Sequence, residues 1–71
     1  MTWVKFNGRG WLVGYKYLTH RMLCEMAGIP TEANPTITYK SADGQGSLTK
    51  TDPEIKVTEG LIIKCLLTGA A

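Results

Sequence analysis

His20 and Cys24 form the one histidine–cysteine pair in this sequence whose spacing could support nucleophilic chemistry. A helix places residues four apart side by side, and a neighbouring imidazole can turn a thiol into a thiolate nucleophile. Catalysis also needs a third group to orient the histidine, and no acid is obviously placed for that role. Cys24 falls on the apolar side of a predicted helix. We therefore expect a buried structural thiol and not a catalytic pair.

The other reactive side chains suggest ordinary structural roles. Asp52 and Glu54 flank Pro53, which is typical of a turn. The chain has two cysteines, Cys24 and Cys65, no CxxC motif and a single histidine, so a Cys/His zinc site cannot be assembled. The glycine-rich "SADGQGS" stretch lacks the strand and helix context of a phosphate-binding loop. We expect reduced, buried thiols and no metal or cofactor site.

Length and charge narrow the class of function. A chain of 71 residues forms one domain with little room for a deep catalytic cleft, which favours a binding or carrier module over an enzyme. The net charge is only +2 and the basic residues are scattered, which does not favour nucleic-acid binding. The sequence shows neither a signal peptide nor an apolar run of membrane-spanning length. We expect a cytoplasmic protein without membrane contact.

The elements that must position any site begin with a hairpin. Residues 2–6 alternate as a strand, Asn7-Gly8 is a strong hairpin-turn signal, and residues 10–13 return. A two-residue turn would pair Val4 with Trp11 and Trp3 with Leu12. A bulge at Gly10 would shift that register and exchange the faces of the second strand. The sequence therefore leaves open which tryptophan is exposed.

One helix is predicted, over residues 19–27. Thr19 can cap its start, and Gly28 fits the left-handed position after its last turn. Apolar residues recur at helical spacing on one face: Met22, Leu23, Met26 and Ala27. His20 and Arg21 lie in the first turn, where the helix dipole disfavours a cation, and we expect them to be tolerated surface residues, with a partner-binding role for this end of the helix as the alternative.

The rest of the sequence favours short strands. We expect strands over residues 36–40, 47–49, 55–57 and 61–67, with a turn segment over 41–47. One helix against a small sheet is an α+β two-layer domain. If the apolar last strand lies beside the first strand and parallel to it, with the helix as cover, the arrangement is the β-grasp fold, a mixed sheet of 4–5 strands.

The last strand is apolar on both faces. One face carries Leu61, Ile63, Cys65 and Leu67, which can supply the core under the helix. The other carries Ile62, Lys64 and Leu66, and a tryptophan from the first hairpin can join them. Exposed apolar patches of this kind usually mark a binding surface. We expect a partner surface made of Trp3, Ile62, Lys64 and Leu66, with cover by a loop or a second copy as the alternative.

The sequence resembles ubiquitin and ubiquitin-like proteins. It is most similar to small bacterial ubiquitin-like proteins of operon-encoded, defence-associated conjugation systems. The resemblance covers nearly the whole chain. It rests on the "FNG" hairpin, the "LTHRMLCEMAGI" helix and the "GSLTKTDPEIKVTEGLIIKCLLTG" segment.

The resemblance implies a β-grasp domain over residues 1–67 and a flexible tail over 68–71. In such proteins an E1-like enzyme uses ATP to activate a C-terminal glycine, and an E2-like enzyme passes the chain to a target amine as an isopeptide. The tail residues are Leu67, Thr68, Gly69, Ala70 and Ala71, and the tail is slim after Leu67, as a narrow enzyme channel requires. The implied activation residue is Gly69, after a peptidase removes Ala70 and Ala71. Because the tail lacks a Gly-Gly pair, Ala71 is the alternative attachment residue.

Other functions are compatible with the sequence. The resemblance also allows a sulfur carrier, although such carriers end in Gly-Gly without an extension. Of two further candidates, one is a non-conjugated β-grasp assembly module that associates with itself through Trp3, Ile62 and Leu66. The other is a small nucleic-acid-binding domain that uses scattered lysines and exposed aromatic residues, for which salt-sensitive binding would be the signature.

Overall fold

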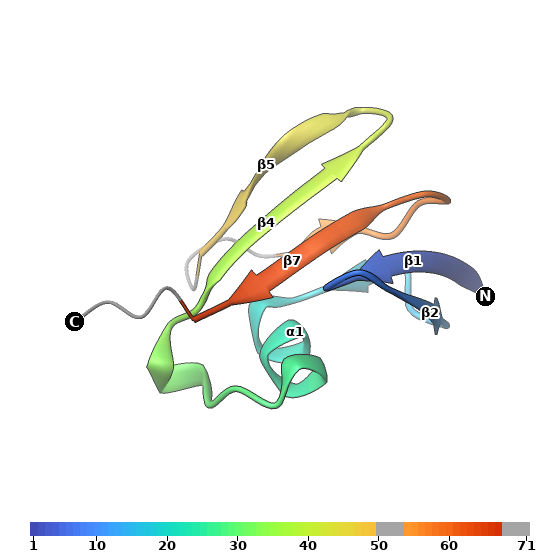
Figure 1. The fold of residues 1–71 in the computed structure, drawn as a ribbon. Helices are drawn as coiled ribbons and strands as arrows, with labels where there is room; N and C mark the ends of the chain where they lie inside the picture. The colour runs from blue at the N-terminus through green and yellow to red at the C-terminus, as the bar shows by residue number, and fades with distance from the viewer. Residues whose placement is uncertain (50–53, 68–71) are drawn as a thin grey trace.

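The structure is a computed structural model that describes residues 1–49 and 54–67 (Figure 1). Its strands, with the α-helix and a short 3₁₀ helix between them, follow in this order: β1 (Thr2–Phe6), β2 (Arg9–Val13), β3 (Tyr17–Leu18), α1 (His20–Ala27), η1 (Thr31–Ala33), β4 (Thr36–Ser41), β5 (Gly44–Leu48), β6 (Ile55–Lys56) and β7 (Ile62–Leu66).

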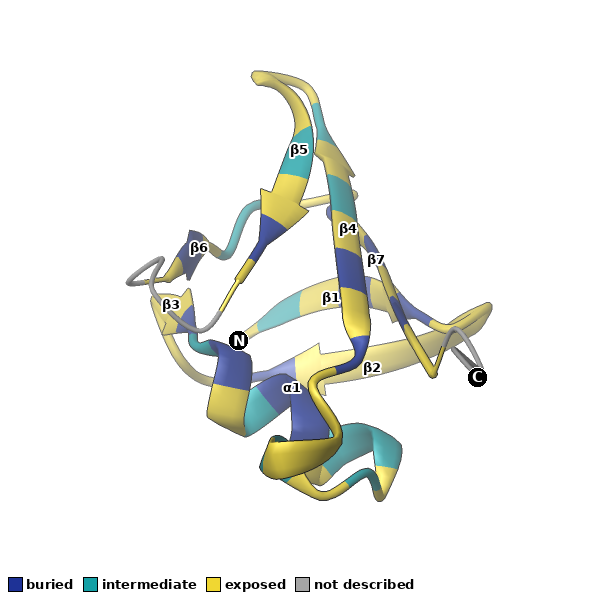
Figure 2. Ribbon diagram, turned by 90° about the vertical axis from the view of Figure 1, so that its left-hand side faces the viewer, coloured by how far each residue is buried: buried dark blue, intermediate teal, exposed yellow. Residues whose placement is uncertain are grey.

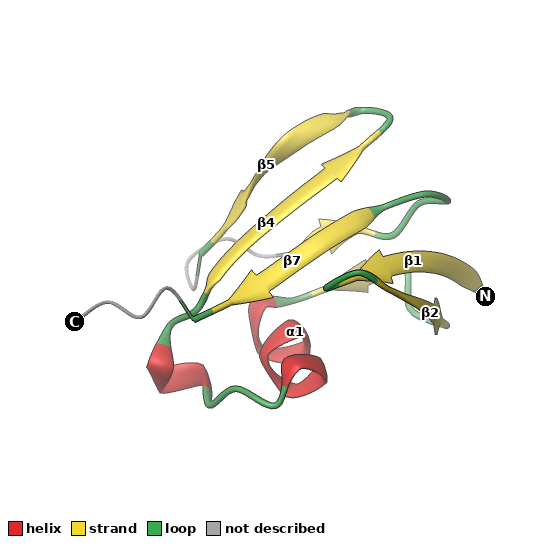
Figure 3. Ribbon diagram, in the orientation of Figure 1, coloured by secondary structure: helices red, strands yellow, loops and turns green. Residues whose placement is uncertain are grey.

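Five of the strands form one mixed sheet in the order β2-β1-β7-β4-β5. The last strand, β7, lies at its centre, parallel to β1 and antiparallel to β4. Helix α1 lies on one side of this sheet (Figure 3), and β3 pairs with β6 as a separate two-stranded sheet. The chain is a small α+β domain with one principal helix and a mixed five-stranded sheet, which confirms the prediction at that level.

The first hairpin has the register of a two-residue turn. Asn7 and Gly8 both have positive φ, 50° and 82°, as a tight hairpin turn requires. Val4 pairs with Trp11, and Trp3 pairs with Leu12. The structure therefore decides between the two registers that the sequence left open, and the hairpin has no bulge at Gly10.

Helix α1 begins and ends where the sequence predicted. The Thr19 hydroxyl accepts a hydrogen bond from the backbone N–H of Met22 at 3.2 Å. Gly28 adopts the left-handed conformation, with φ of 71°, and its N–H donates to the Glu25 carbonyl at 3.1 Å. The expectation of a surface His20 is wrong: the side chain is only 6% exposed, because it faces the core beside Cys24.

The core lies between α1 and the sheet. Its members are apolar side chains from the helix, the strands and their connections: Val4, Phe6, Val13, Leu18, Leu23, Ile37, Leu48, Ile55, Leu61, Ile63 and Cys65. Figure 2 shows buried and exposed residues alternating along β4 and β7, as expected for strands with one covered face. Leu67 was assigned to the core face but is 55% exposed, because β7 ends one residue earlier, at Leu66.

Two further expectations need correction. The segment 41–47 was predicted as a turn, but β4 runs to Ser41 and β5 begins at Gly44, so the connection is short. Strand β3 was not predicted, since it has two residues and pairs only with the distant β6.

Over the described ranges, 1–49 and 54–67, no helix is long and apolar enough to cross a membrane.

Candidate partner-binding face

The sheet has one side away from α1, which we call the open face. Side chains alternate across a strand, so the neighbours of buried Val4, Ile63 and Ile37 point to this side. The larger side chains on the open face are Trp3, Lys5, Leu12, Lys40, Ile62, Lys64 and Leu66. All seven are exposed. Each is held by a paired strand, so the positions of their Cα atoms are fixed by the sheet.

The open face carries all four predicted partner residues, which are Trp3, Ile62, Lys64 and Leu66. They do not form one cluster. The register of β1 and β7 places Ile62 beside Lys5, whereas Trp3 lies two residues earlier on β1. The Trp3 ring lies over Gly10 of β2, the neighbouring strand on the side away from β7, since a Cβ built on Gly10 would lie 3.6 Å from the ring. On the open face, Trp3 is therefore grouped with its cross-strand partner Leu12.

The second tryptophan has a different environment. Trp11 pairs with Val4 and so points to the helix side of the sheet. Its ring packs edge-to-face against Phe6, with centroids 5.7 Å apart and planes at 77°. Trp3 is 57% exposed and Trp11 is 37% exposed. Trp3 is thus the tryptophan available to a partner on the open face.

The part of the open face around Ile62 is hollowed. A hollow of about 560 Å³ is lined by Ile62 and Lys64 of β7 and by residues of β4 and β5, among them Thr38, Lys40 and Ser47. The Ile62 side chain supplies an apolar surface between two lysines. A partner side chain that is apolar and adjacent to a carboxylate would fit this arrangement.

The charges on the open face have one sign. Lys5, Lys40 and Lys64 are exposed there, and the five strands of the main sheet contain no Asp or Glu. The uniform charge favours an acidic partner surface, since complementary charge steers association. Sequence reasoning missed Lys5, Lys40 and Leu12. The alternation of each strand places them on this face once the sheet order is known.

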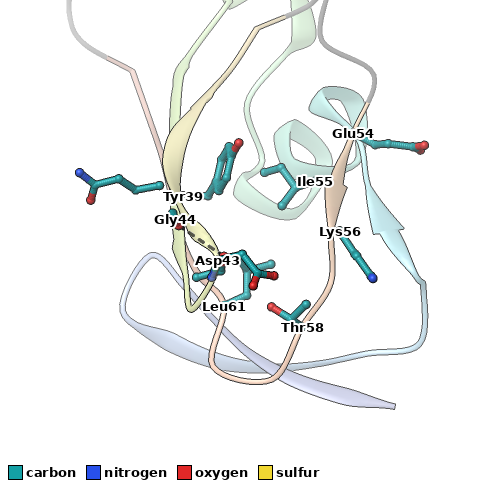
Figure 4. A pocket seen from close by; sticks show the side chains of 10 residues that line it. Tyr39, Asp43, Gly44, Glu54, Ile55, Lys56, Thr58 and Leu61 are labelled. Atoms are coloured by element: carbon teal, nitrogen blue, oxygen red, sulfur yellow. Dashed lines mark hydrogen bonds between the residues drawn. The ribbon is translucent and has the colours of Figure 1, made fainter.

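A second hollow lies on the helix side of the sheet, below β4 and β5 (Figure 4). Its volume is about 280 Å³, and Tyr39, Asp43, Ile55 and Thr58 are among the residues around it. Glu54 and Lys56 bring charges of both signs. In the described part of the chain, no group of three or more His, Cys, Asp or Glu side chains could hold a metal ion.

The structure brings His20 and Cys24 together, but in a buried setting. The Cys24 sulfur lies 3.7 Å from Nδ1 of His20, and Nε2 of the same ring is buried without a partner in the described residues. Cys65 lies beside Cys24, and burial, with the neighbouring Cys24 thiol, raises the pKa of Cys65 to about 11. The Cys65 thiol is therefore protonated at neutral pH, and neither sulfur is open to a substrate.

The predicted activation residue, Gly69, follows β7 in the sequence. The described chain leaves the sheet at Leu66 and continues to the exposed Leu67. The tail residues Thr68, Gly69, Ala70 and Ala71 lie outside the described residues. The described chain therefore ends at the protein surface, one residue beyond β7.

No protein-family model, curated protein or solved structure matches this chain.

Proposed function

We propose that this chain is a ubiquitin-like modifier with the β-grasp fold, and that it acts in the cytoplasm in a bacterial, defence-associated conjugation system. An E1-like enzyme would activate it at Gly69, and an E2-like enzyme would pass it to a target amine. The protein itself would be the transferred group and not an enzyme. A peptidase would first cut after Gly69, and Ala71 is the alternative attachment residue.

The observation that carries the proposal is the position of β7. This strand lies at the centre of the sheet, parallel to β1, and delivers the chain to the exposed Leu67 at one edge of the domain. The residues that follow in the sequence are small, and Gly69 has no side chain beside its carbonyl. A slim segment attached to a rigid domain is what an enzyme channel needs in order to place a carboxylate for attack.

The proposed chemistry is acyl transfer. The Gly69 carboxylate would attack the α-phosphorus of ATP on the E1-like enzyme and release pyrophosphate. An enzyme nucleophile would then displace AMP, and a target amine would displace that nucleophile and form an amide. None of these steps needs a catalytic side chain from this chain. Its own contribution is recognition, for which the open face offers Ile62, Lys64 and Leu66.

The experiment is coexpression with the proteins encoded beside its gene, among which the proposal expects E1-like, E2-like and peptidase proteins, followed by intact mass spectrometry. We expect loss of the residues after Gly69 and a product joined through Gly69. A Gly69→Val variant should fold and fail at activation, because the added side chain crowds the attacked carbonyl. A chain truncated after Gly69 should be activated without the peptidase. A product joined through Ala71 would refute the processing step, and failure of both chains to react would refute conjugation.

A non-conjugated assembly module is the second candidate. The exposure of Trp3 and Leu66, 57% and 54%, favours it, since apolar side chains on an open sheet can be covered by another copy. This module would form complexes that survive Gly69→Val and dissociate on Leu66→Ser. Binding to RNA or DNA that falls steeply with added salt would instead support a nucleic-acid role for the three lysines.

A further inference from the structure

Strand β5 forms one edge of the five-stranded sheet. Among the described residues it pairs with β4 alone, and its outer side carries unpaired backbone groups. Four of its five residues are exposed or half-buried, Leu48 being the exception. Figures 1 and 2 show the β4–β5 hairpin extending away from α1, so the helix does not cover this edge.

This edge lacks the features that usually prevent strand pairing. Natural edge strands carry charged residues, proline or a bulge that blocks another strand. The sequence of β5, Gly44–Leu48, contains no charge and no proline, and its register with β4 is continuous from Gly44 to Leu48. The opposite edge, β2, differs because it carries Arg9 and the large side chains of Trp11 and Leu12.

The register identifies the free backbone groups on β5. Ser41 and Gly44 close the hairpin around a two-residue turn, and in such a hairpin the closing pair bonds across the ladder. Bonded and non-bonded pairs then alternate, so Gly46 bonds to Tyr39, while the N–H and C=O of Gln45 and Ser47 point outward. These two residues present two donors and two acceptors in one line.

We propose that a second copy of this chain pairs with β5 in the antiparallel direction, about a two-fold axis at Gly46. Gln45 of one copy would lie opposite Ser47 of the other, and the pairing would form four backbone hydrogen bonds. A two-fold pairing is self-complementary, and β5 suits it because identical uncharged strands do not repel each other.

The glycine at the axis makes close approach possible. In this register the two Gly46 residues form a non-hydrogen-bonded pair, in which the Cα atoms are nearest to each other. Tyr39 covers Gly46 on the helix side, since a Cβ built there would lie 2.9 Å from the tyrosine oxygen. The two Tyr39 rings would then lie on either side of the new seam, with no side chain between the strands.

We expect the dimer to be weak, because the geometry gives it a small interface. Four hydrogen bonds and a single-strand contact make a small interface, for which we expect a Kd on the order of 0.1 to 1 mM. The two-fold axis would be perpendicular to the sheet, so both open faces would lie on the same side. The inference does not depend on conjugation, because neither Gly69 nor the tail takes part.

Sedimentation equilibrium of the intact chain, from roughly 0.02 to 2 mM, tests the proposal by bracketing the expected Kd. We expect reversible dimers, and slower amide exchange at Gln45 and Ser47 as the concentration rises. The double variants Q45E/S47E and Q45K/S47K place like charges opposite each other, so each should remain monomeric. An equimolar mixture of the two should form a heterodimer at least tenfold tighter than either homodimer, because opposite charges then meet across the seam.

Lys16→Glu is the matched control. It lowers the net charge by two units, as Q45E/S47E does, but at an exposed position outside the sheet, and it should dimerise as the unmodified chain does. All the substituted side chains are exposed, so folding should be preserved, and circular dichroism checks it. A chain that stays monomeric at 2 mM, or dimers that persist in both double variants, would overturn the proposal. Dissociation by Leu66→Ser with β5 variants unaffected would place the contact on the open face instead.

Discussion

The side-chain amide of Asn7 forms two hydrogen bonds with the backbone of Cys65. Its Oδ1 accepts from the Cys65 N–H at 2.8 Å, and its Nδ2 donates to the Cys65 carbonyl at 3.1 Å. The Asn7 backbone N–H also donates to the carbonyl of Ile63 at 2.9 Å. The amide therefore continues the β1–β7 ladder past the point at which the chain turns, and holds β7 near the exit of the tail.

Asn7→Gly should separate the turn conformation of this residue from the hydrogen bonds of its side chain. Glycine accepts the positive φ of the turn but removes both side-chain hydrogen bonds. We expect the free energy of unfolding to fall by about 1 to 3 kcal/mol, since each bond contributes about 1 kcal/mol and the Cys65 backbone loses its partner. Urea denaturation measures the change. Asn34→Gly is the control, because exposed Asn34 has the same φ of 50°. Equal losses in both variants would contradict the role of the amide.

The two ends of α1 should each contribute to stability. Gly28→Ala places a Cβ at φ of 71°, and we expect a loss of about 1 kcal/mol or more even though no atom obstructs the added carbon. Thr19→Ala removes the hydroxyl that caps Met22 and should cost about 1 kcal/mol. Thermal unfolding would measure both. Thr19→Ser keeps the cap and should stay within a few tenths of a kcal/mol of the original.

Substitutions on the open face of β7 should weaken partner binding, whereas substitutions on its core face should lower stability. Ile62 is 39% exposed and Leu66 is 54% exposed, so Ile62→Ser with Leu66→Ser should cost little stability, within about 1 kcal/mol per site. Under the proposed function the same pair should weaken binding to the E1-like enzyme about tenfold or more. Ile63→Ala should cost about 2 to 5 kcal/mol, because Ile63 is fully buried. Calorimetry and denaturation together would show whether the open face binds.

Stability should depend on the ionisation of Cys65 at high pH. Burial and the Cys24 thiol raise its pKa from 9.0 to about 11 in the folded protein, so folding favours the neutral thiol. The contribution of the neutral Cys65 thiol to the free energy of unfolding is complete below about pH 9. It is lost as the pH rises towards 11, because the thiol ionises at a lower pH in the unfolded chain. Cys65→Ala should show a shallower decline over that window, measured with a reductant present. Parallel curves would show that other groups cause the decline.

The thiols should not be needed for transfer. A variant with Cys24→Ser and Cys65→Ser should retain conjugation at some cost in stability, since both sulfurs are buried and neither is open to a substrate. Gel analysis of the coexpressed system would measure the product. Loss of all product from a folded variant would indicate that a thiol takes part in transfer.

Local signals in the sequence located the first hairpin turn and the helix. Asn7-Gly8 marked the position of the first turn, and Thr19 with Gly28 marked the ends of α1, because caps and positive φ depend on residues adjacent in the chain. The alternation of 61–67 also predicted that Ile62, Lys64 and Leu66 share a face. These features need no knowledge of distant contacts, and the structure has each of them.

Tertiary structure decided everything that depends on which strands are neighbours. It placed β7 between β1 and β4, separated Trp3 from Ile62, brought three lysines to one face and left β5 as an edge. It also gave Asn7 a partner 58 residues away, and buried His20 beside Cys24. The physical reason is that the hydrophobic effect is non-directional. An apolar pattern therefore requires that a strand be buried, but it does not specify which strand lies beside it. That choice is made only when all the strands pack together.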